Sequence, residues 1–374
     1  MNQHIYADNA ATTGLDEAAF EAMMPWLLEE FGNASQPYSF SRKAREALKK
    51  ARKTIAECIN ALPEEIYFTS GGTEGDNWVI KSSALSDPEK GATITSAFEH
   101  HAILRSCAAI ERLGYPVAYM WPTGDGYITP EILEKYVGQS TRIVSVMYAN
   151  NEIGSIQPIQ GLCEIAHTHG ALFHTDAVQA IGHIKVDVHD LGVDFLSASA
   201  HKFNGPKGIG FLYIRKGIKL PPYFDGGSQE YTYRAGTENV AAIAGMATAL
   251  KINIDLLEQN QQHILNLEKG LIRQLDKAGI IYKCNGGDSK LPGLLSLSFP
   301  GKDGEAILHR MDLMGISVAT GSACDSVNTE ISHVLRAIRL DERYAIGTIR
   351  ISLGKNNTVE EVEKIAVALN KILA

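Results

Sequence analysis

Apolar and polar positions follow two different rhythms between about residues 65 and 215. Short, almost continuously apolar runs predict buried strands, and segments with apolar residues at three- and four-residue spacing predict helices. The predicted strands are 65–70, 91–98, 141–149, 171–176, 193–199 and 208–214, and the predicted helices among them are 73–85, 101–113 and 158–169. Apolar strands alternating with amphipathic helices indicate an α/β fold whose mostly parallel sheet is covered on both faces.

From Thr237 to about Lys277 the pattern is helical almost throughout, which predicts one helix, or a helix pair, bridging to a second unit. That unit has an α+β pattern. Its predicted strands are 293–299 and 347–353, and its predicted helices are 304–311, 332–338 and a last one beginning at Thr358. No Pro/Gly/Ser-rich linker separates the units, so we expect the second to pack against the first.

Composition narrows the class of protein. The 374 residues suffice for a large core and a smaller second unit. A formal net charge of −8 disfavours a nucleic-acid or anionic-membrane surface. No apolar run approaches membrane-spanning length, and the first residues show no signal-peptide pattern. The five scattered cysteines, without Cys-x-x-Cys, disfavour a disulfide framework and fit a reducing cytoplasm.

Polar residues follow several predicted strands, and ligands of α/β sheets bind beyond the carboxyl ends of strands. The candidates are Ser70-Gly71-Gly72-Thr73, Asn150-Asn151-Glu152, Asp176 with Gln179, and Ser199 with His201 and Lys202. Small residues that open a helix let backbone N–H groups approach a phosphate. Taken alone, Gly71-Gly72-Thr73 favours a tight turn with a threonine N-cap over a phosphate site.

Asp176 and Lys202 follow two different predicted strands, beside the phosphate-type loop Gly71-Gly72-Thr73, and this combination indicates pyridoxal phosphate. A lysine forms a Schiff base with the aldehyde, and a carboxylate keeps the pyridine nitrogen protonated. Ser199 and His201 would add hydrogen bonds, and Gln179 would reach the ring oxygen. In isolation Lys202 is a solvated loop lysine and Asp176 a helix N-cap, but these alternatives leave their convergence unexplained.

A zinc site is the competing interpretation, because His167, His169, His174 and Asp176 lie within ten residues. Residues two apart on a helix point to different sides, so His167 and His169 cannot both reach one ion. We expect them at the surface near a helix C-terminus. His100 and His101 follow strand 91–98, and one of them is expected in the crevice unless the two cap a helix.

Two further residues suit an amino-acid substrate. Alternation along 347–353 puts Ile349, Ile351 and Leu353 on one face and Arg350 on the other. Arginine binds carboxylates bidentately, although an exposed strand face is the alternative. Residues 319–327, A-T-G-S-A-C-D-S-V, surround Cys324 with small and polar residues that cannot form a core, so this thiol is expected to be reachable.

The chain resembles the NifS-type cysteine desulfurases of the class V aminotransferase family, which are pyridoxal-phosphate enzymes. The resemblance covers nearly the whole chain. Its motifs are Y-A-D-N-A-A-T-T (6–13), F-T-S-G-G-T-E-G-D-N (68–77), E-H-H-A (99–102), N-N-E-I-G (150–154), H-T-D-A-V-Q (174–179), S-A-H-K-F-N-G-P-K-G (199–208), R-A-G-T-E-N (234–239), G-S-A-C (321–324) and I-R-I-S-L-G (349–354).

The resemblance implies an aspartate-aminotransferase-like fold, with a large cofactor-binding domain at 15–255 and a small domain at 1–14 and 256–374.

The resemblance also implies a role for each matched residue. Lys202 would be the Schiff-base lysine, Asp176 would pair with the pyridine nitrogen, and His100 would stack on the ring and shuttle protons. Asn151 and Gln179 would lie near the ring hydroxyl, with Asn151 also near the substrate. Gly72, Thr73, Ser199 and His201 would hold the phosphate, and Arg350 would bind the substrate carboxylate. Thr237 would reach the phosphate of the neighbouring subunit, which implies a homodimer.

The implied activity converts L-cysteine to L-alanine and leaves a persulfide on Cys324. The sulfur would pass to an iron–sulfur scaffold or another acceptor protein in the cytoplasm, with no nucleic-acid or membrane partner. No stable metal site is expected, although Cys324 would be able to ligate an iron–sulfur cluster transiently. Asp325 disfavours the thiolate, so deprotonation would depend on His100 or on the bound substrate.

The chain departs from the family pattern at two places. Relatives often carry His and Gly where this chain has Tyr38 and Ser41, and a different sequence where it has 325–331. The second departure leaves the sulfur acceptor open. The alternatives are a transaminase or lyase of the same fold, a selenocysteine-specific enzyme, and a non-catalytic scaffold. A mobile thiol argues against the transaminase, and retention of Lys202, Asp176, His100 and Cys324 argues against the scaffold.

Overall fold

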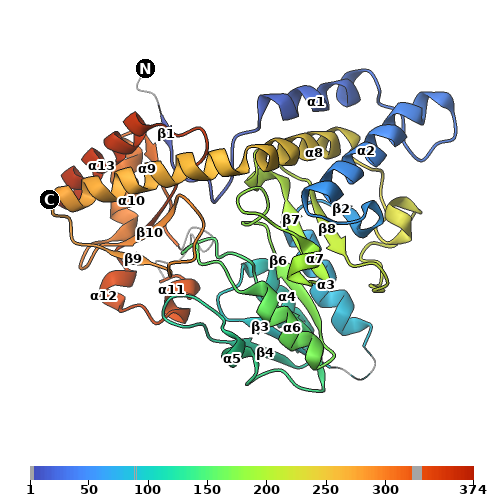
Figure 1. Cartoon of the computed structure of the whole chain (residues 1–374), viewed down its shortest axis with the longest axis horizontal. Helices are drawn as coiled ribbons and strands as arrows, with labels where there is room; N and C mark the ends of the chain where they lie inside the picture. The colour runs from blue at the N-terminus through green and yellow to red at the C-terminus, as the bar shows by residue number, and fades with distance from the viewer. Residues whose placement is uncertain (1–3, 88, 90, 322–330) are drawn as a thin grey trace.

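The computed structural model describes residues 4–87, 89, 91–321 and 331–374. Its centre is a seven-stranded sheet (Figure 1). In spatial order the strands are β2 (Ile66–Thr69), β8 (Gly210–Ile214), β7 (Phe195–Ser199), β6 (Leu172–Asp176), β5 (Thr141–Ser145), β3 (Ala92–Ser96) and β4 (Val117–Met120). β8 runs antiparallel to both of its neighbours, and all other pairs are parallel. Because β8 is antiparallel to both β2 and β7, β2 runs in the same direction as β7. The strands β2, β3, β5, β6 and β7 therefore all end at the same edge of the sheet.

Side chains that alternate along the strands enter two different cores, so both faces of the sheet are covered. Phe195 of β7 packs in one cluster with Trp78, and Leu196 packs in another with Leu250. The first face carries α3 (Gly72–Leu85) and α4 (His101–Arg112), and the second carries α2 (Arg42–Cys58), α6 (Ile159–Thr168) and α8 (Val240–Asp255). Helix α1 (Glu17–Leu28) packs on α8, and α5 (Pro130–Leu133) and α7 (Val188–Leu191) are short. The α/β prediction is confirmed.

The long helical region is a pair of helices, which is the second of the two predicted possibilities. Helix α9 (Leu257–Lys277) follows α8 after a bend of 71° at Leu256. Figure 1 shows α9 crossing from the large unit to the smaller one. Among the described residues, no single helix is long and apolar enough to cross a membrane, although this bent pair passes the same test when both helices are counted together.

The smaller unit has its own apolar cluster, to which α9 contributes Ile264, Leu267 and Leu271. Strand β10 (Leu294–Ser298) lies between β12 (Thr348–Ser352) and β9 (Lys283–Asn285) in an antiparallel sheet, and β1 (Ile5–Tyr6) pairs with β11 (Ile316–Ser317). Its helices are α10 (Gly304–Leu313), α11 (His333–Ala337), α12 (Glu342–Ala345) and α13 (Val359–Leu373). Helix α11 packs Val334 and Leu335 into the core of the large unit, so the units meet closely. The exact domain bounds stay a prediction.

Gly210, at the start of β8, lies against the loop that follows β2. A Cβ atom at this position would be 2.3 Å from the Ala198 carbonyl oxygen and 2.8 Å from the Gly71 Cα. Both neighbours are backbone atoms, which cannot rotate away as a side chain can.

We therefore predict that Gly210→Ala lowers the free energy of unfolding by at least about 2 kcal/mol, because the strand or the Gly71 loop must shift. Urea unfolding measures the effect. Gly138→Ala is the matched control, since its Cβ would meet nothing within 4 Å. Equal unfolding midpoints for the two variants would contradict the packing argument.

Candidate active site

The strand ends surround a cavity of about 400 Å³ between the two units. Its lining includes ten of the predicted site residues: Gly72, Thr73, His100, Asn151, Asp176, Gln179, Ser199, His201, Lys202 and Arg350. Thr237 does not line it, and Cys324 lies outside the described residues. Thr320 and Gly321, which precede the segment with Cys324, do line the cavity.

One end of the cavity is the N-terminus of α3, which offers backbone N–H groups. The N-cap is Gly71, and no side chain caps the helix. The alternative in which Thr73 is the N-cap is therefore wrong; Thr73 lies in the first turn and is exposed. Ser199, at the end of β7, lines the same cavity and is only 5% exposed. Uncapped N–H groups and the helix dipole make this end suited to an anion.

Lys202 follows β7 on a single turn of 3₁₀ helix, η3 (Ala200–Lys202). Its Nζ donates hydrogen bonds to the carbonyl oxygens of Ala10, at 2.6 Å, and Ala11, at 2.9 Å. Gln179 Nε2 also donates to the Ala10 oxygen, at 2.9 Å. The N-terminal segment thus gives the lysine a fixed position at the cavity wall.

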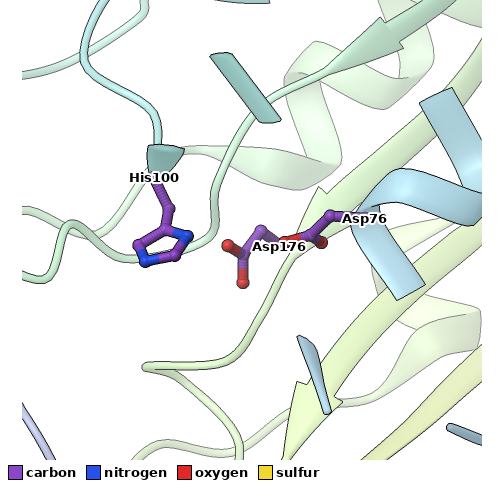
Figure 2. Close-up of side chains that lie close together, drawn as sticks. All are labelled: Asp76, His100 and Asp176. Atoms are coloured by element: carbon purple, nitrogen blue, oxygen red, sulfur yellow. The ribbon is translucent and has the colours of Figure 1, made fainter. Parts of the chain in front are cut away.

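His100 and Asp176 face one another, together with Asp76 of α3 (Figure 2). One ligand atom of each residue lies within 4.8 Å of the others. Burial lowers the pKa of His100, an effect opposed by Asp176 and reinforced by the charge of Lys202. The His100 Nδ1 accepts a hydrogen bond from the Ala102 N–H at 3.1 Å, so the neutral ring carries its proton on Nε2.

Burial also neutralises His201, whose pKa falls to about 4, mainly through desolvation and secondly through Lys202. Its Nδ1 lies 3.1 Å from the Thr12 hydroxyl. At neutral pH the imidazole can therefore offer a hydrogen bond to an anion but not a positive charge.

Arg350 reaches the cavity from β12 of the smaller sheet. Ile349, Ile351 and Leu353 lie in the core of that unit, as the alternation predicted, and Arg350 is 7% exposed, so the alternative of an exposed strand face is wrong. Its Nη2 donates to Asp8 Oδ1 at 2.7 Å and its Nη1 to the Asn151 carbonyl at 2.8 Å. The buried Nε has no hydrogen-bond partner among the described residues.

Glu152 lies where the cavity meets the segment that carries Cys324. Ser332, which follows that segment, donates to Glu152 Oε2 at 2.5 Å, and a Cβ on Gly321 would lie 2.5 Å from the same oxygen. This carboxyl therefore bonds one flank of the segment and lies close against the other, and burial raises its pKa to about 7.

Thr237 is exposed and follows a segment held by two ion pairs. Arg52 pairs with Glu230 at 2.6 Å, and Arg234 pairs with Glu74 of α3 at 2.8 Å. Glu230, Tyr231 and Thr232 have φ values of 45°, 57° and 73°, which cost about 1–2 kcal/mol each for residues other than glycine. The predicted contact of Thr237 with a neighbouring subunit stays a prediction.

The remaining sequence candidates lie elsewhere. His167, near the end of α6, pairs with Asp194 at 2.8 Å, and His174 is buried between the hydroxyls of Ser145 and Ser197. These histidines do not gather around one point. Tyr38 is exposed and Ser41 is buried beside α2, and neither departure from the family pattern lines the cavity.

The donor set of the cavity fits pyridoxal phosphate. The cofactor needs anion donors for its phosphate, a carboxylate for its pyridine nitrogen and a primary amine for its aldehyde. The α3 N-terminus with Ser199, the Asp176 carboxyl and the Lys202 amine are these three groups, and they come from neighbouring strand ends of one cavity. The unpartnered Nε of the buried Arg350 adds a donor for a further anionic group.

Comparison with known proteins agrees with this geometry. The family model described as Aminotransferase class-V matches residues 5–365. The cysteine desulfurase IscS of Dictyoglomus turgidum is 46% identical over the whole chain and 95% of its own length. A NifS-like protein structure superposes with a TM-score of 0.94 at 37% identity, covering 99% of both chains. The structure of SspA in complex with cysteine superposes with a TM-score of 0.85 at 33% identity, covering 95% of this chain and 100% of SspA.

The fold and the cavity define a class V aminotransferase, and the chain belongs to that family. Within the family it belongs to the NifS-type cysteine desulfurases, so the resemblance seen in the sequence is confirmed.

Two residues with functional positions were missed in the sequence, Asp8 and Asp76, although both stand inside motifs of the family. A partner for Arg350 from residue 8 depends on a contact across 342 positions. Asp76 had a local signal. It lies one turn after Gly72, on the face of α3 that packs on the sheet, where an apolar residue is expected.

The charge of Lys202 is one of the causes that lower the pKa of His100. We predict that Lys202→Ala, in the chain without added cofactor, raises this pKa toward 6.5 because a nearby positive charge is removed. Histidine NMR titration measures it, with His100→Gln to assign the signal. Lys207→Ala removes an exposed lysine of the same loop and is the control; a His100 pKa that does not rise in Lys202→Ala would refute the coupling.

Proposed function

We propose that the protein is a pyridoxal-phosphate-dependent cysteine desulfurase that converts L-cysteine to L-alanine and leaves the sulfur as a persulfide on Cys324. The observation that carries the proposal is the meeting of Lys202, Asp176 and the α3 N-terminus in one cavity, in a chain whose relatives bear this activity in their names. The cysteine bound in the SspA structure supports L-cysteine as the substrate.

Bound pyridoxal phosphate supplies an electron sink that weakens bonds at the substrate α- and β-carbons. Lys202 attaches the cofactor, and Asp176 keeps a proton on its pyridine nitrogen. Thr73, Ser199, His201 and the Gly72 N–H hold the phosphate, with Asn151 and Gln179 near the ring hydroxyl. These groups would hold the cofactor in one orientation, because they follow strands that end at the same edge of the sheet.

Arg350 binds the substrate carboxylate with the N–H donors that Asp8 and the Asn151 carbonyl leave unused. His100, neutral in its buried position, moves a proton between the substrate and the sulfur groups. The carbon–sulfur bond of L-cysteine breaks as the Cys324 sulfur attacks the substrate sulfur. The carbon fragment gains the protons that complete L-alanine, so cysteine and thiol become alanine and persulfide without an external oxidant.

We further propose a homodimer, with Thr237 completing the phosphate site of the partner subunit. Exposed apolar side chains on and after α1 support an interface there, with Leu28 73% exposed and Phe31 71% exposed. The persulfide would pass to an iron–sulfur scaffold or another acceptor protein in the cytoplasm. The four described cysteines are free thiols, as that compartment requires. The division of the chain into a large domain at 15–255 and a small domain at 1–14 and 256–374 remains part of this proposal.

The test is the release of sulfide and alanine from L-cysteine with a reductant, comparing the chain with Cys324→Ala. Equal amounts of both products are expected from the chain, and both should be lost in the variant while its cofactor absorbance remains. Cys284→Ala changes a thiol outside the cavity and should behave like the unchanged chain.

A Cys324→Ala variant that releases sulfide at the original rate would refute the nucleophile and favour a lyase or transaminase. An unchanged chain that releases no sulfide from L-cysteine but acts on selenocysteine would favour the selenocysteine-specific alternative. Absence of cofactor binding by the unchanged chain would refute the whole proposal.

For the substrate contact, we predict that Arg350→Lys raises the KM for L-cysteine about tenfold to 100-fold and changes kcat much less. Lysine keeps the charge but loses the planar, bidentate geometry. Steady-state kinetics of alanine release measure both constants. Arg310→Lys, on α10, is the control, because Arg310 bonds the Ile372 carbonyl outside the cavity. An unchanged KM would place the carboxylate elsewhere.

A further inference from the structure

A second buried carboxyl, Asp76, lies behind Asp176 and has no role in the steps above. Asp76 is 1% exposed and Asp176 is 5% exposed. Figure 2 shows Asp76 on the side of Asp176 away from His100. The approach requires Gly75, because a Cβ there would lie 2.8 Å from the Ser197 hydroxyl of β7. Helix α3 is therefore close enough to the sheet for Asp76 to reach the end of β6.

A carboxyl oxygen of Asp76 lies within 4.8 Å of one of Asp176, so the two groups are placed to share a hydrogen bond, and the Ser197 hydroxyl lies beside Asp76. A hydrogen bond between two carboxyl groups requires a proton on one of them. Asp176 also accepts the Val178 N–H at 2.9 Å. The backbone after β6 thus supplies one donor that orients the Asp176 carboxylate, and a protonated Asp76 would supply a second from α3.

The histidine beside Asp76 does not offset an ionised carboxylate at this position. His174 Nε2 lies 3.7 Å from Asp76 Oδ1, but burial lowers the His174 pKa to about 3, so the ring is neutral. Asp176 and Glu99 add negative potential, and Asp76 Oδ1 has no hydrogen-bond partner among the described residues. Burial, and then Asp176, raise the pKa of Asp76 well above its usual value. A divalent cation here would need both carboxylates ionised, which the same burial opposes.

We propose that Asp76 is a positioning residue that donates a hydrogen bond to the Asp176 carboxylate and confines the pair to a single negative charge. Its role toward the pyridine nitrogen rests on the proposed function, whereas the shared proton does not. With Asp76 protonated, Asp176 alone carries the charge and is fixed toward the cavity. With both ionised, like charges would repel in a buried site.

The first test follows the unfolding constant of the full chain, without added cofactor, between pH 4.5 and 7. The folded chain holds a proton on Asp76 that the unfolded chain releases above the usual aspartate pKa of 3.8. Stability from this group is therefore greatest at low pH and falls as pH rises toward the folded pKa. Asp76→Asn keeps a neutral donor and has no proton to release.

The ratio of the unfolding constants, unchanged chain over Asp76→Asn, is expected to rise up to tenfold per pH unit in this window. The groups facing Asp76, namely Asp176, His174, Glu99 and His100, are present in both proteins and largely cancel in the ratio. Asp125→Asn, at an exposed aspartate, is the control for the substitution itself. A ratio that does not change with pH would overturn the shared proton.

A second measurement needs no substitution, should Asp76→Asn fail to fold. In the unchanged chain with ¹³C-labelled aspartate, infrared spectroscopy at pH 7 should show the carbonyl stretch of a protonated aspartic acid, shifted by the label. Buried glutamic acids are unlabelled and keep their own band. Absence of a labelled band would overturn the proposal.

The positioning role is tested by titration with pyridoxal phosphate. Asp76→Asn is expected to bind it within about threefold of the unchanged chain, and Asp76→Leu, which removes the donor, about tenfold more weakly or worse. Equal affinities for the two variants would refute positioning. If the unchanged chain bound no pyridoxal phosphate, the proposed function would fail, and the first two measurements would still decide the shared proton.

Discussion

Desolvation is the constraint on which the rest of the site depends. The strand ends meet where two units pack together, and few charges are stable there. Burial lowers the pKa of His100 and His201 and raises that of Glu99 to about 8, which keeps these groups largely neutral. The site can therefore supply hydrogen-bond donors without accumulating charge. A charged ligand would meet a small number of fixed, oppositely charged groups, whose effect is strong because little water screens them.

The N-terminal segment links the two units at this place. Ala10 accepts hydrogen bonds from Lys202 and Gln179 of the large unit, while Asp8 pairs with Arg350 of the small unit. The Thr12 hydroxyl lies beside His201. A segment with almost no regular structure thus sets the distance between the amine end and the guanidinium end of the cavity. The spacing between these two groups therefore depends on the Ala10 carbonyl and the Asp8 carboxylate as well as on how the units pack.

Much of the fold and most of the cavity could be predicted from the sequence, because each depended on local pattern. Apolar runs predicted six of the seven strands of the large sheet and missed β4, and the rule that ligands bind beyond strand ends selected Asp176 and Lys202. The sequence pattern could not distinguish one helix from two here, because it is apolar on both sides of the bend at Leu256. Asp8 was missed because its partner is distant in sequence, and Asp76 because an acidic residue in a helix is usually solvated. Cys324 lies outside the described residues, so its prediction rests on sequence and resemblance.

The turn at Glu230, Tyr231 and Thr232 has a consequence for assembly. Its left-handed backbone is maintained within one chain by the buried Arg52, which contacts Glu230 and stacks over Phe68 at 4.3 Å. The conformational restriction is therefore complete before any second chain arrives. A surface that is already ordered loses little entropy on association, so more of the contact energy remains as affinity. In the proposed homodimer, the segment before Thr237 would therefore act as a preformed docking edge rather than as a loop that folds on contact.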